Sequence, residues 1–139
     1  MKAGHDSKTA AMAKVPLFSR CSKSELRRIA QIADEVDLRR GRTLTKEGTR
    51  GREFFIILDG TAEVRSNTRL LPSLKAGDFL GEIALVTDAP RTATVTATSP
   101  VRVLVITERA FRELLRNHPG IQGKILETVA SRLAATART

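Results

Sequence analysis

The sequence is poor in cysteine, histidine and aromatic residues, and each shortage excludes a class of protein. Its one cysteine, Cys21, has no partner for an internal disulfide, so a secreted fold held by disulfides is excluded. The two histidines, His5 and His118, are too few for a cupin-type enzyme whose barrel holds a metal ion in clustered histidines. There is no tryptophan or tyrosine, and none of the five phenylalanines lies in a basic cluster, so a base-stacking surface for nucleic acid is not indicated.

Long apolar segments and catalytic motifs are also missing. The longest continuous apolar run, residues 54–58, has the length of a buried strand and falls far short of the roughly 18 residues that a membrane span needs. The basic N-terminus lacks the apolar stretch of a secretory signal, so we expect the protein to be located in the cytoplasm. No Ser-His-Asp set, Cys-His pair or Gly-x-Gly-x-x-Gly loop is evident, and we expect no enzymatic activity. Cys21 is interpreted as a small half-buried side chain beside Phe18, and His118 as a residue favoured by a helix C-terminus.

The net charge of +9 makes nucleic acid a partner to consider, but the distribution of the charge along the chain favours a solvated basic face. Most of the excess positive charge lies before residue 53. Beyond the last expected helix only residues 135–139 remain, which are too few for a recognition helix. We therefore expect no sequence-specific binding of DNA.

The length favours one domain. Residues 1–13 are small, polar and charged without an apolar period, and we expect a flexible N-terminal tail followed by a domain over residues 14–139. Ser22 and Glu25 form a capping-box pattern before apolar residues at helical spacing, which predicts a helix over residues 23–34.

The middle of the chain has the pattern of short strands. Residues 54–58 and 61–65 read as strands joined by the tight turn Asp59-Gly60, residues 92–98 alternate strictly, and residues 101–105 form the last strand. Thr107 is expected to cap a helix over residues 108–117, and Pro119-Gly120 separates it from a final helix at about residues 119–137. The fold class is mainly β with flanking helices: an antiparallel, jelly-roll-like β-barrel with an N-terminal helix, a short helix within residues 81–94 and two C-terminal helices.

Residues 81–94 interrupt the β pattern with residue types suited to a small anion attached to a sugar. Gly81 lets a backbone approach a ligand closely, and a single helical turn from Glu82 exposes N–H groups that suit a phosphate. Arg91 offers a planar fork of donors for two phosphate oxygens. A phosphate would repel Glu82, which is therefore expected to accept a hydrogen bond from a neutral group such as a ribose hydroxyl. From the residues alone, a structural ion pair between Glu82 and Arg91 at the rim of the barrel stays open.

The whole segment closely resembles the phosphate-binding cassette of the cyclic nucleotide-binding domain family, which includes the regulatory subunits of cyclic-AMP-dependent protein kinase and the catabolite activator protein. The residues that carry the resemblance are Gly81, Glu82, Ala84, Leu85, Pro90, Arg91, Thr92, Ala93, Thr94 and Val95. It implies that Arg91 binds the cyclic phosphate and that Glu82 holds the ribose 2′-hydroxyl. The ligand-binding residues that it implies are Gly81, Glu82, Ile83, Ala84, Arg91, Thr92 and Ala93. Arg52 departs from the family pattern, which often has an acid there, but it lies outside the cassette.

The resemblance also implies that the final helix moves over the bound base, with Leu126 and Val129 as candidate base contacts. We expect cyclic AMP as the ligand, although a hydroxyl at Thr92 is compatible with cyclic GMP, and no cofactor or metal ion. The effector protein or domain is not identifiable from the sequence, and the C-terminal helix offers a surface for a dimer. The alternative is a barrel that kept the fold and lost the ligand, acting as a protein-interaction module.

Overall fold

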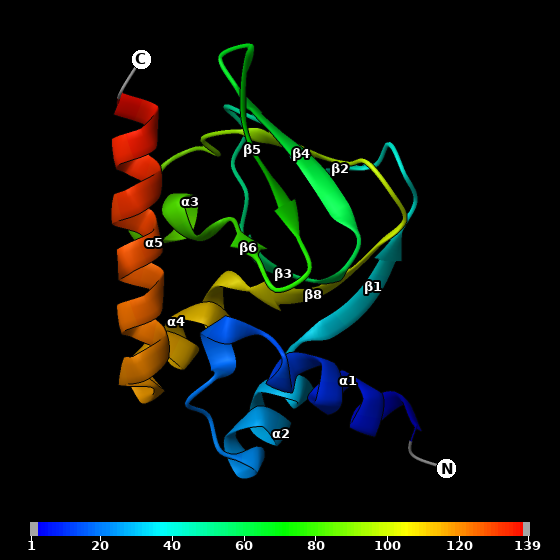
Figure 1. The fold of residues 1–139 in the computed structure, drawn as a ribbon. Coiled ribbons are helices and arrows are strands. Elements are labelled where there is room, and N and C mark those ends of the chain that lie inside the picture. Colours follow the sequence, from blue (N-terminus) through cyan, green and yellow to red (C-terminus); the bar gives the residue numbers. More distant parts are fainter. Residues whose placement is uncertain (1–2, 138–139) are drawn as a thin grey trace.

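Antiparallel strands in two sheets make up the centre of the molecule, and helices cover one end and one side of them (Figure 1). The computed structural model describes residues 3–137. The strands are β1 (Asp34–Leu38), β2 (Thr43–Thr45), β3 (Glu53–Asp59), β4 (Thr61–Ser66), β5 (Arg69–Lys75), β6 (Phe79–Leu80), β7 (Thr94–Ala97) and β8 (Val101–Thr107). The helices are α1 (Ala3–Ala13), the 3-10 turn η1 (Pro16–Phe18), α2 (Lys23–Ile32), α3 (Glu82–Thr87), α4 (Glu108–Asn117) and α5 (Pro119–Ala137).

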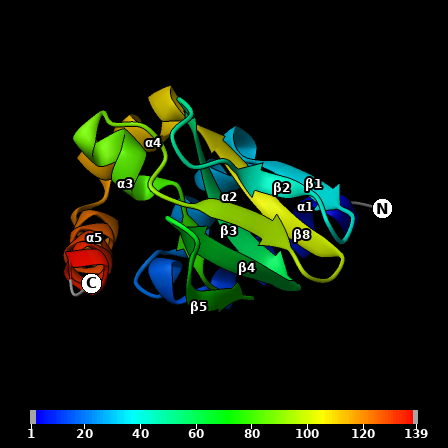
Figure 2. The ribbon, with the colours of Figure 1, turned by 90° about the horizontal axis from the view of Figure 1, so that it is seen from above.

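The two sheets are each four-stranded, in the orders β1-β8-β3-β6 and β2-β7-β4-β5. Every pairing is antiparallel, which confirms the mainly β, antiparallel fold with flanking helices. The sheets face each other as a sandwich and do not close into a continuous barrel, as the view from above shows (Figure 2).

The apolar run at residues 54–58 lies in strand β3 and contributes side chains to two hydrophobic cores, one on each face of the strand. Side chains alternate across a strand, so Phe54 and Ile56 face the helices while Phe55 and Ile57 face the second sheet. Both faces of this strand are buried, and a strand buried on both sides reads as a continuous apolar run. The ring of Phe54 lies 4.6 Å from that of Phe111 in α4, between centroids, which ties the first sheet to the helical layer.

Short capping patterns in the sequence predicted the boundaries of α2, α4 and α5 to within two residues. Both bonds of the expected capping box are present: the Glu25 amide donates to Ser22 Oγ (3.1 Å) and the Ser22 amide donates to Glu25 Oε1 (2.8 Å). The helix ends two residues earlier than expected, at Ile32, because Asp34 already pairs with Val105 in the sheet. Thr107 caps α4 as predicted, by accepting a hydrogen bond from the amide of Ala110.

The N-terminal segment differs from the flexible tail that we expected over residues 1–13. Residues 1–2 lie outside the described residues, and Ala3–Ala13 forms helix α1. Met12 is fully buried in the helical core, and Lys8 donates to the carbonyls of Ala30 and Ala33 at the end of α2. Helix α1 is anchored by the buried side chain of Met12 and by the hydrogen bonds of Lys8 to the end of α2. Two such contacts leave no periodic apolar pattern in the sequence, so the helix was not predicted.

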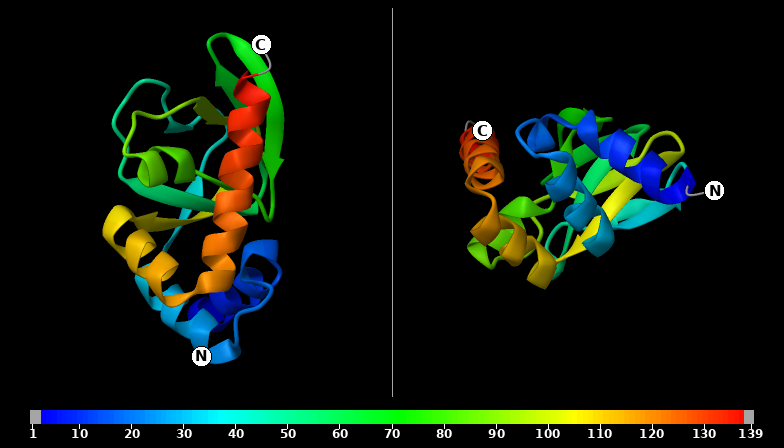
Figure 3. Two further views of the ribbon diagram at one scale, coloured as in Figure 1. Left: turned by 90° about the vertical axis from the view of Figure 1, so that its left-hand side faces the viewer. Right: turned by 90° about the horizontal axis from the view of Figure 1, so that it is seen from below.

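Helix α5 runs along the side of the sandwich, past α3 (Figure 3). Its buried residues Ile121, Ile125 and Val129 pack into the helical core. Leu126 and Leu133 lie on its outer side, with 51% and 45% of their surface exposed. None of the helices in the described part of the chain combines the length and the apolarity needed to cross a membrane.

Candidate functional site

A cavity of about 340 Å³ lies between the segment 81–94, the sheet that contains β4 and β5, and helix α5. Every residue of the segment 81–94 that was predicted to bind a ligand lines it, namely Gly81, Glu82, Ile83, Ala84, Arg91, Thr92 and Ala93. The other lining residues are Thr45, Val64, Leu71, Pro72, Ser73, Leu74, Asp78, Leu80, Val95, Ser131 and Arg132. The wall is therefore apolar on the side of the strands and charged beside α3 and α5.

Gly81 introduces helix α3 with a left-handed backbone, at φ 94°. A Cβ atom there would lie 2.7 Å from the carbonyl oxygen of Glu53 and 2.8 Å from Nη1 of Arg91. Glycine is therefore required at this position for two reasons: the left-handed backbone conformation, and the lack of space for a Cβ atom beside Glu53 and Arg91. The close approach seen here is to the protein's own β3 and Arg91, and the approach of a ligand to Gly81 stays a prediction.

Arg91 is a buried cation that is held in place by carbonyl groups. Its side chain is 6% exposed, and it donates to the carbonyl oxygens of Glu53 (2.9 Å) and Gly81 (3.3 Å). Burial lowers the pKa of the guanidinium, and the carboxylates of Glu53 and Glu82 oppose that effect. An arginine stays protonated at any physiological pH, so the cavity contains a desolvated positive charge. Among the side chains that the structure describes, those of residues 8–134, no carboxylate comes within ion-pair distance of it.

The position of Arg91 depends on Gly51, in the loop that precedes β3. A Cβ atom on Gly51 would fall 1.9 Å from Nε of Arg91, so only glycine leaves space for the guanidinium. The neighbouring Arg52 turns away and forms a 2.9 Å ion pair with Glu108 at the start of α4. This agrees with the expectation that Arg52 lies outside the ligand site.

Glu82, the first residue of α3, is 1% exposed and forms an ion pair with Arg132 of α5. Nη1 of Arg132 lies 2.6 Å from both carboxylate oxygens, and Nη2 donates to the carbonyl of Phe79. The sequence had left open a structural pair between Glu82 and Arg91, but the partner is Arg132. This contact connects the C-terminal half of α5 to the segment 81–94, which resembles the cassette.

The remaining predicted residues form the frame of the cavity. Ile83 and Ala84 are buried in the first turn of α3. Thr92 is exposed, and its carbonyl accepts a hydrogen bond from Ser66 Oγ (2.8 Å), while the carbonyl of Ala93 accepts one from Thr45 Oγ1 (3.0 Å). These bonds hold the chain after Arg91 against two strands of the second sheet.

The structure does not bring Leu126 and Val129 to the cavity. Leu126 lies on the exposed side of α5, and Val129 belongs to the helical core. The α5 residues that line the cavity are Ser131 and Arg132, which the sequence analysis missed. A charged residue in a mostly apolar, small-residue helix is a weak signal, because an exposed arginine looks the same in sequence.

The arrangement is suited to an anion that carries a hydroxyl-bearing group. Arg91 supplies a fixed fork of donors in a partly dry site, where electrostatic interactions are stronger than in water. Glu82, which is paired with Arg132, supplies carboxylate oxygens in the same cavity, and Val64, Leu71 and Val95 offer an apolar surface for a ring.

Comparison with known proteins agrees with this chemistry. The family model described as "Cyclic nucleotide-binding domain" matches residues 35–118. A "cAMP-dependent protein kinase regulatory subunit" from Mycosarcoma maydis is 43% identical over 119 residues, which are 77% of this chain and 22% of that protein. Curated relatives of this description are several times longer, and the chain spans between 22% and 28% of their length.

Solved structures share the fold. The structure "cAMP bound PfPKA-R (141-441)" matches with a TM-score of 0.76 and 25% identity, over 91% of this chain and 47% of the other. A "Regulatory subunit of a cAMP-independent protein kinase A from Trypanosoma brucei" matches with a TM-score of 0.82 and 19% identity, over 89% of this chain and 45% of the other. At that identity the second match shows the fold alone.

Proposed function

The chain belongs to the cyclic nucleotide-binding domain family, and on that premise we propose that it binds cyclic AMP, more tightly than cyclic GMP, in the cavity between α3 and α5. The observation that supports this most is the buried guanidinium of Arg91, which has carbonyl partners but no ion pair among the described residues. A cyclic phosphate carries the one negative charge that this site lacks. The preference for cyclic AMP rests on the description of the relatives as cAMP-dependent regulatory subunits.

The roles follow from the chemistry of the cavity. Arg91 binds the phosphate, Glu82 accepts a hydrogen bond from the ribose 2′-hydroxyl, and the backbone of residues 83–84 and 92–93 surrounds the phosphate and the sugar. The base lies against the apolar strand residues. Thr92 is exposed at the edge of the cavity, where its hydroxyl can reach a phosphate oxygen or the amine of a guanine. The domain acts by binding, without catalysis.

We further propose that α5 is the element that transmits binding. Both oxygens of Glu82 accept hydrogen bonds from Arg132, so a ribose hydroxyl that reaches Glu82 competes with the helix for the same acceptor. A ligand shifts a conformational equilibrium only through its different affinity for the two states. Competition for Glu82 provides such a difference and loosens the contact between α5 and α3.

Calorimetric titration with cyclic AMP and with cyclic GMP tests the ligand. We expect saturable binding of both, with cyclic AMP tighter, and loss of binding in Arg91→Ala. Arg52→Ala is the matched control, because it removes an arginine in the loop before β3 that does not line the cavity. No heat with either nucleotide at millimolar concentration would overturn the proposal.

Amide hydrogen exchange with saturating cyclic AMP tests the movement. We expect changes of exchange within residues 119–134 as well as protection within residues 81–94, with α2 as the control element because it lies away from the cavity. Protection confined to residues 81–94, with α5 unchanged, would show that the helix packs permanently and carries no signal.

A second candidate is a barrel of the same fold that binds no nucleotide and acts as a protein-interaction module. The observation in its favour is the Glu82–Arg132 pair, which satisfies the acceptor without a ligand. The similar fold of a regulatory subunit described as cAMP-independent shows that the fold alone does not define the ligand. The calorimetric titration separates the two candidates directly. For either one, a protein kinase is the first effector to test, since the relatives are regulatory subunits of a kinase.

A further inference from the structure

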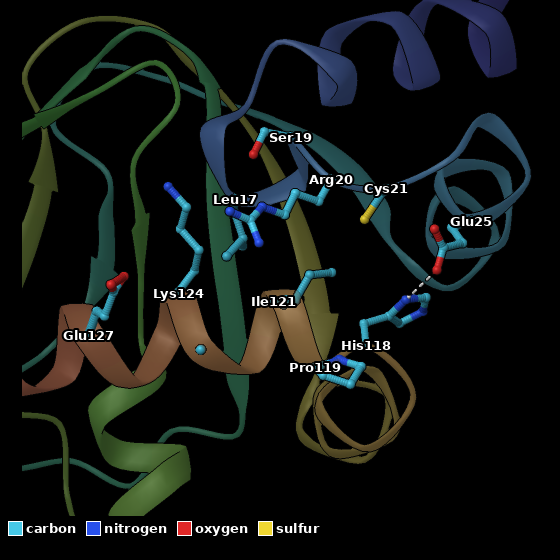
Figure 4. Close-up of a pocket in the computed structure, with 12 residues that line it drawn as sticks. Leu17, Ser19, Arg20, Cys21, Glu25, His118, Pro119, Ile121, Lys124 and Glu127 are labelled. Atoms are coloured by element: carbon cyan, nitrogen blue, oxygen red, sulfur yellow. Dashed lines mark hydrogen bonds and ion pairs between the residues drawn. The ribbon is translucent and has the colours of Figure 1, made fainter.

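A second cavity, of about 610 Å³, lies at the other end of α5 and brings together Cys21, Glu25 and His118 (Figure 4). These residues come from distant parts of the chain: the loop before α2, the first turn of α2 and the residue that ends α4. One donor atom from each lies within 4.8 Å of the others. No Cys-His pair is evident in the sequence, because nearly a hundred residues separate Cys21 from His118.

The donor set has the composition of a transition-metal site. A thiolate, an imidazole and a carboxylate are the ligands that Zn²⁺ and its neighbours prefer, whereas Mg²⁺ and Ca²⁺ take oxygen ligands. In a tetrahedral zinc site with bonds of 2.0–2.3 Å, ligand atoms lie about 3.3–3.8 Å apart. The present separations, 4.8 Å at most, exceed that range by about 1 Å at most.

The surroundings leave each donor accessible to an ion. Oε1 of Glu25 is engaged by the Ser22 amide, while Oε2 points to Nδ1 of His118 at 3.0 Å and keeps further lone pairs. Only 13% of the His118 side chain is exposed, so its ring is held in a defined place.

We propose that Cys21, Glu25 and His118 bind one divalent transition-metal ion of the zinc class, with the fourth position open to the cavity. Arg20 lines the same cavity next to Cys21, and its positive charge suits a hydroxide or another anion at that position. Figure 4 shows the three donors gathered at one end of the pocket, with Lys124 and Glu127 at the other. The ion would join the start of α2 to the junction of α4 and α5.

The experiment uses the full, untagged chain after removal of metal by a chelator. Zn²⁺ is titrated against a chromophoric chelator, and Co²⁺ is added separately as a spectroscopic probe. We expect one Zn²⁺ per chain and a thiolate-to-cobalt charge-transfer band in the near ultraviolet. Cys21→Ser and His118→Gln should each weaken Zn²⁺ binding by more than the about 10–100-fold that loss of an outer-shell partner costs. Glu25→Gln should weaken it less, because glutamine preserves the capping box.

His5→Gln is the matched control, because it removes the only other histidine and should leave Zn²⁺ affinity unchanged. The thermal midpoint of the wild type should rise with Zn²⁺, and that of His118→Gln should not. Zn²⁺ binding that survives in both Cys21→Ser and His118→Gln, or a cobalt complex without the thiolate band, would overturn the proposal. The cobalt spectrum is measured on the wild type, so it decides the matter even if a variant fails to fold.

Discussion

Replacing Arg132 by glutamine tests whether α5 is fastened to the cavity through Glu82. The Glu82 side chain is 1% exposed, whereas 30% of the Arg132 side chain is exposed. Removing one partner of a fully buried pair costs about 3–5 kcal/mol, and surface pairs contribute about 0–1 kcal/mol. Because Arg132 is partly exposed, we expect Arg132→Gln to lower the free energy of unfolding by about 2–3 kcal/mol.

The opposite substitution should cost less. Glu82→Gln leaves an arginine that can turn its head group towards solvent, and the amide still accepts one hydrogen bond, so we expect a loss of about 1 kcal/mol. The double variant should lose about 0.5–3 kcal/mol less than the sum of the two single losses, as residues in direct contact do. Urea denaturation of the four proteins measures these values.

Nucleotide titration of the same variants distinguishes the role of the Glu82–Arg132 pair in stability from the role of Glu82 in ligand binding. Arg132→Gln frees Glu82 for the ribose and should tighten cyclic AMP binding, while Glu82→Gln should weaken it by about 1.5–3 kcal/mol. Arg102→Gln is the matched control, because Arg102 forms exposed ion pairs with Asp37 and Glu35 far from the cavity and its loss should barely move the unfolding midpoint. Additive losses in the double variant, or weaker binding in Arg132→Gln, would refute the competition between helix and ribose.

Three further predictions follow from the same geometry. Arg91→Ala should weaken cyclic AMP binding by about 3–5 kcal/mol in calorimetry, since it leaves a desolvated phosphate unpaired, and a loss as small as that of Arg52→Ala would contradict the assigned role. Gly51→Ala places a Cβ 1.9 Å from Nε of Arg91 and should weaken binding by displacing the guanidinium; unchanged affinity would mean that Arg91 does not need its present position. Hydrogen bonds from Arg112 and Arg52 lower the pKa of Glu108, so its stabilising contribution is present above the unfolded-state pKa and is lost as the pH falls through the lower folded-state value. Glu108→Gln should therefore flatten the acid limb of stability below about pH 4, measured by thermal unfolding, and an unaltered limb would assign it to other carboxylates.

Local chemistry was enough to predict most of the fold and part of the site. The capping box at Ser22 and Glu25, the cap at Thr107 and the turn at Gly60 depend on residues a few positions apart, and each was found where the sequence predicted it. The cavity residues between 81 and 93 were also predictable, because one continuous segment contains them. Gly81, Glu82 and Arg91 lie close in sequence as well as in space.

The sequence by itself therefore determined the class of fold, the order of most elements after α1 and the segment that lines the cavity, since all of these depend on short-range spacing and on alternating burial. Only the tertiary structure decided that Arg132 pairs with Glu82, that Met12 completes the helical core and that Cys21 lies beside His118. Each of these contacts joins elements whose relative placement results from packing of the whole core. An exposed arginine, an isolated methionine and a lone cysteine look alike in sequence whether or not a distant element later covers them.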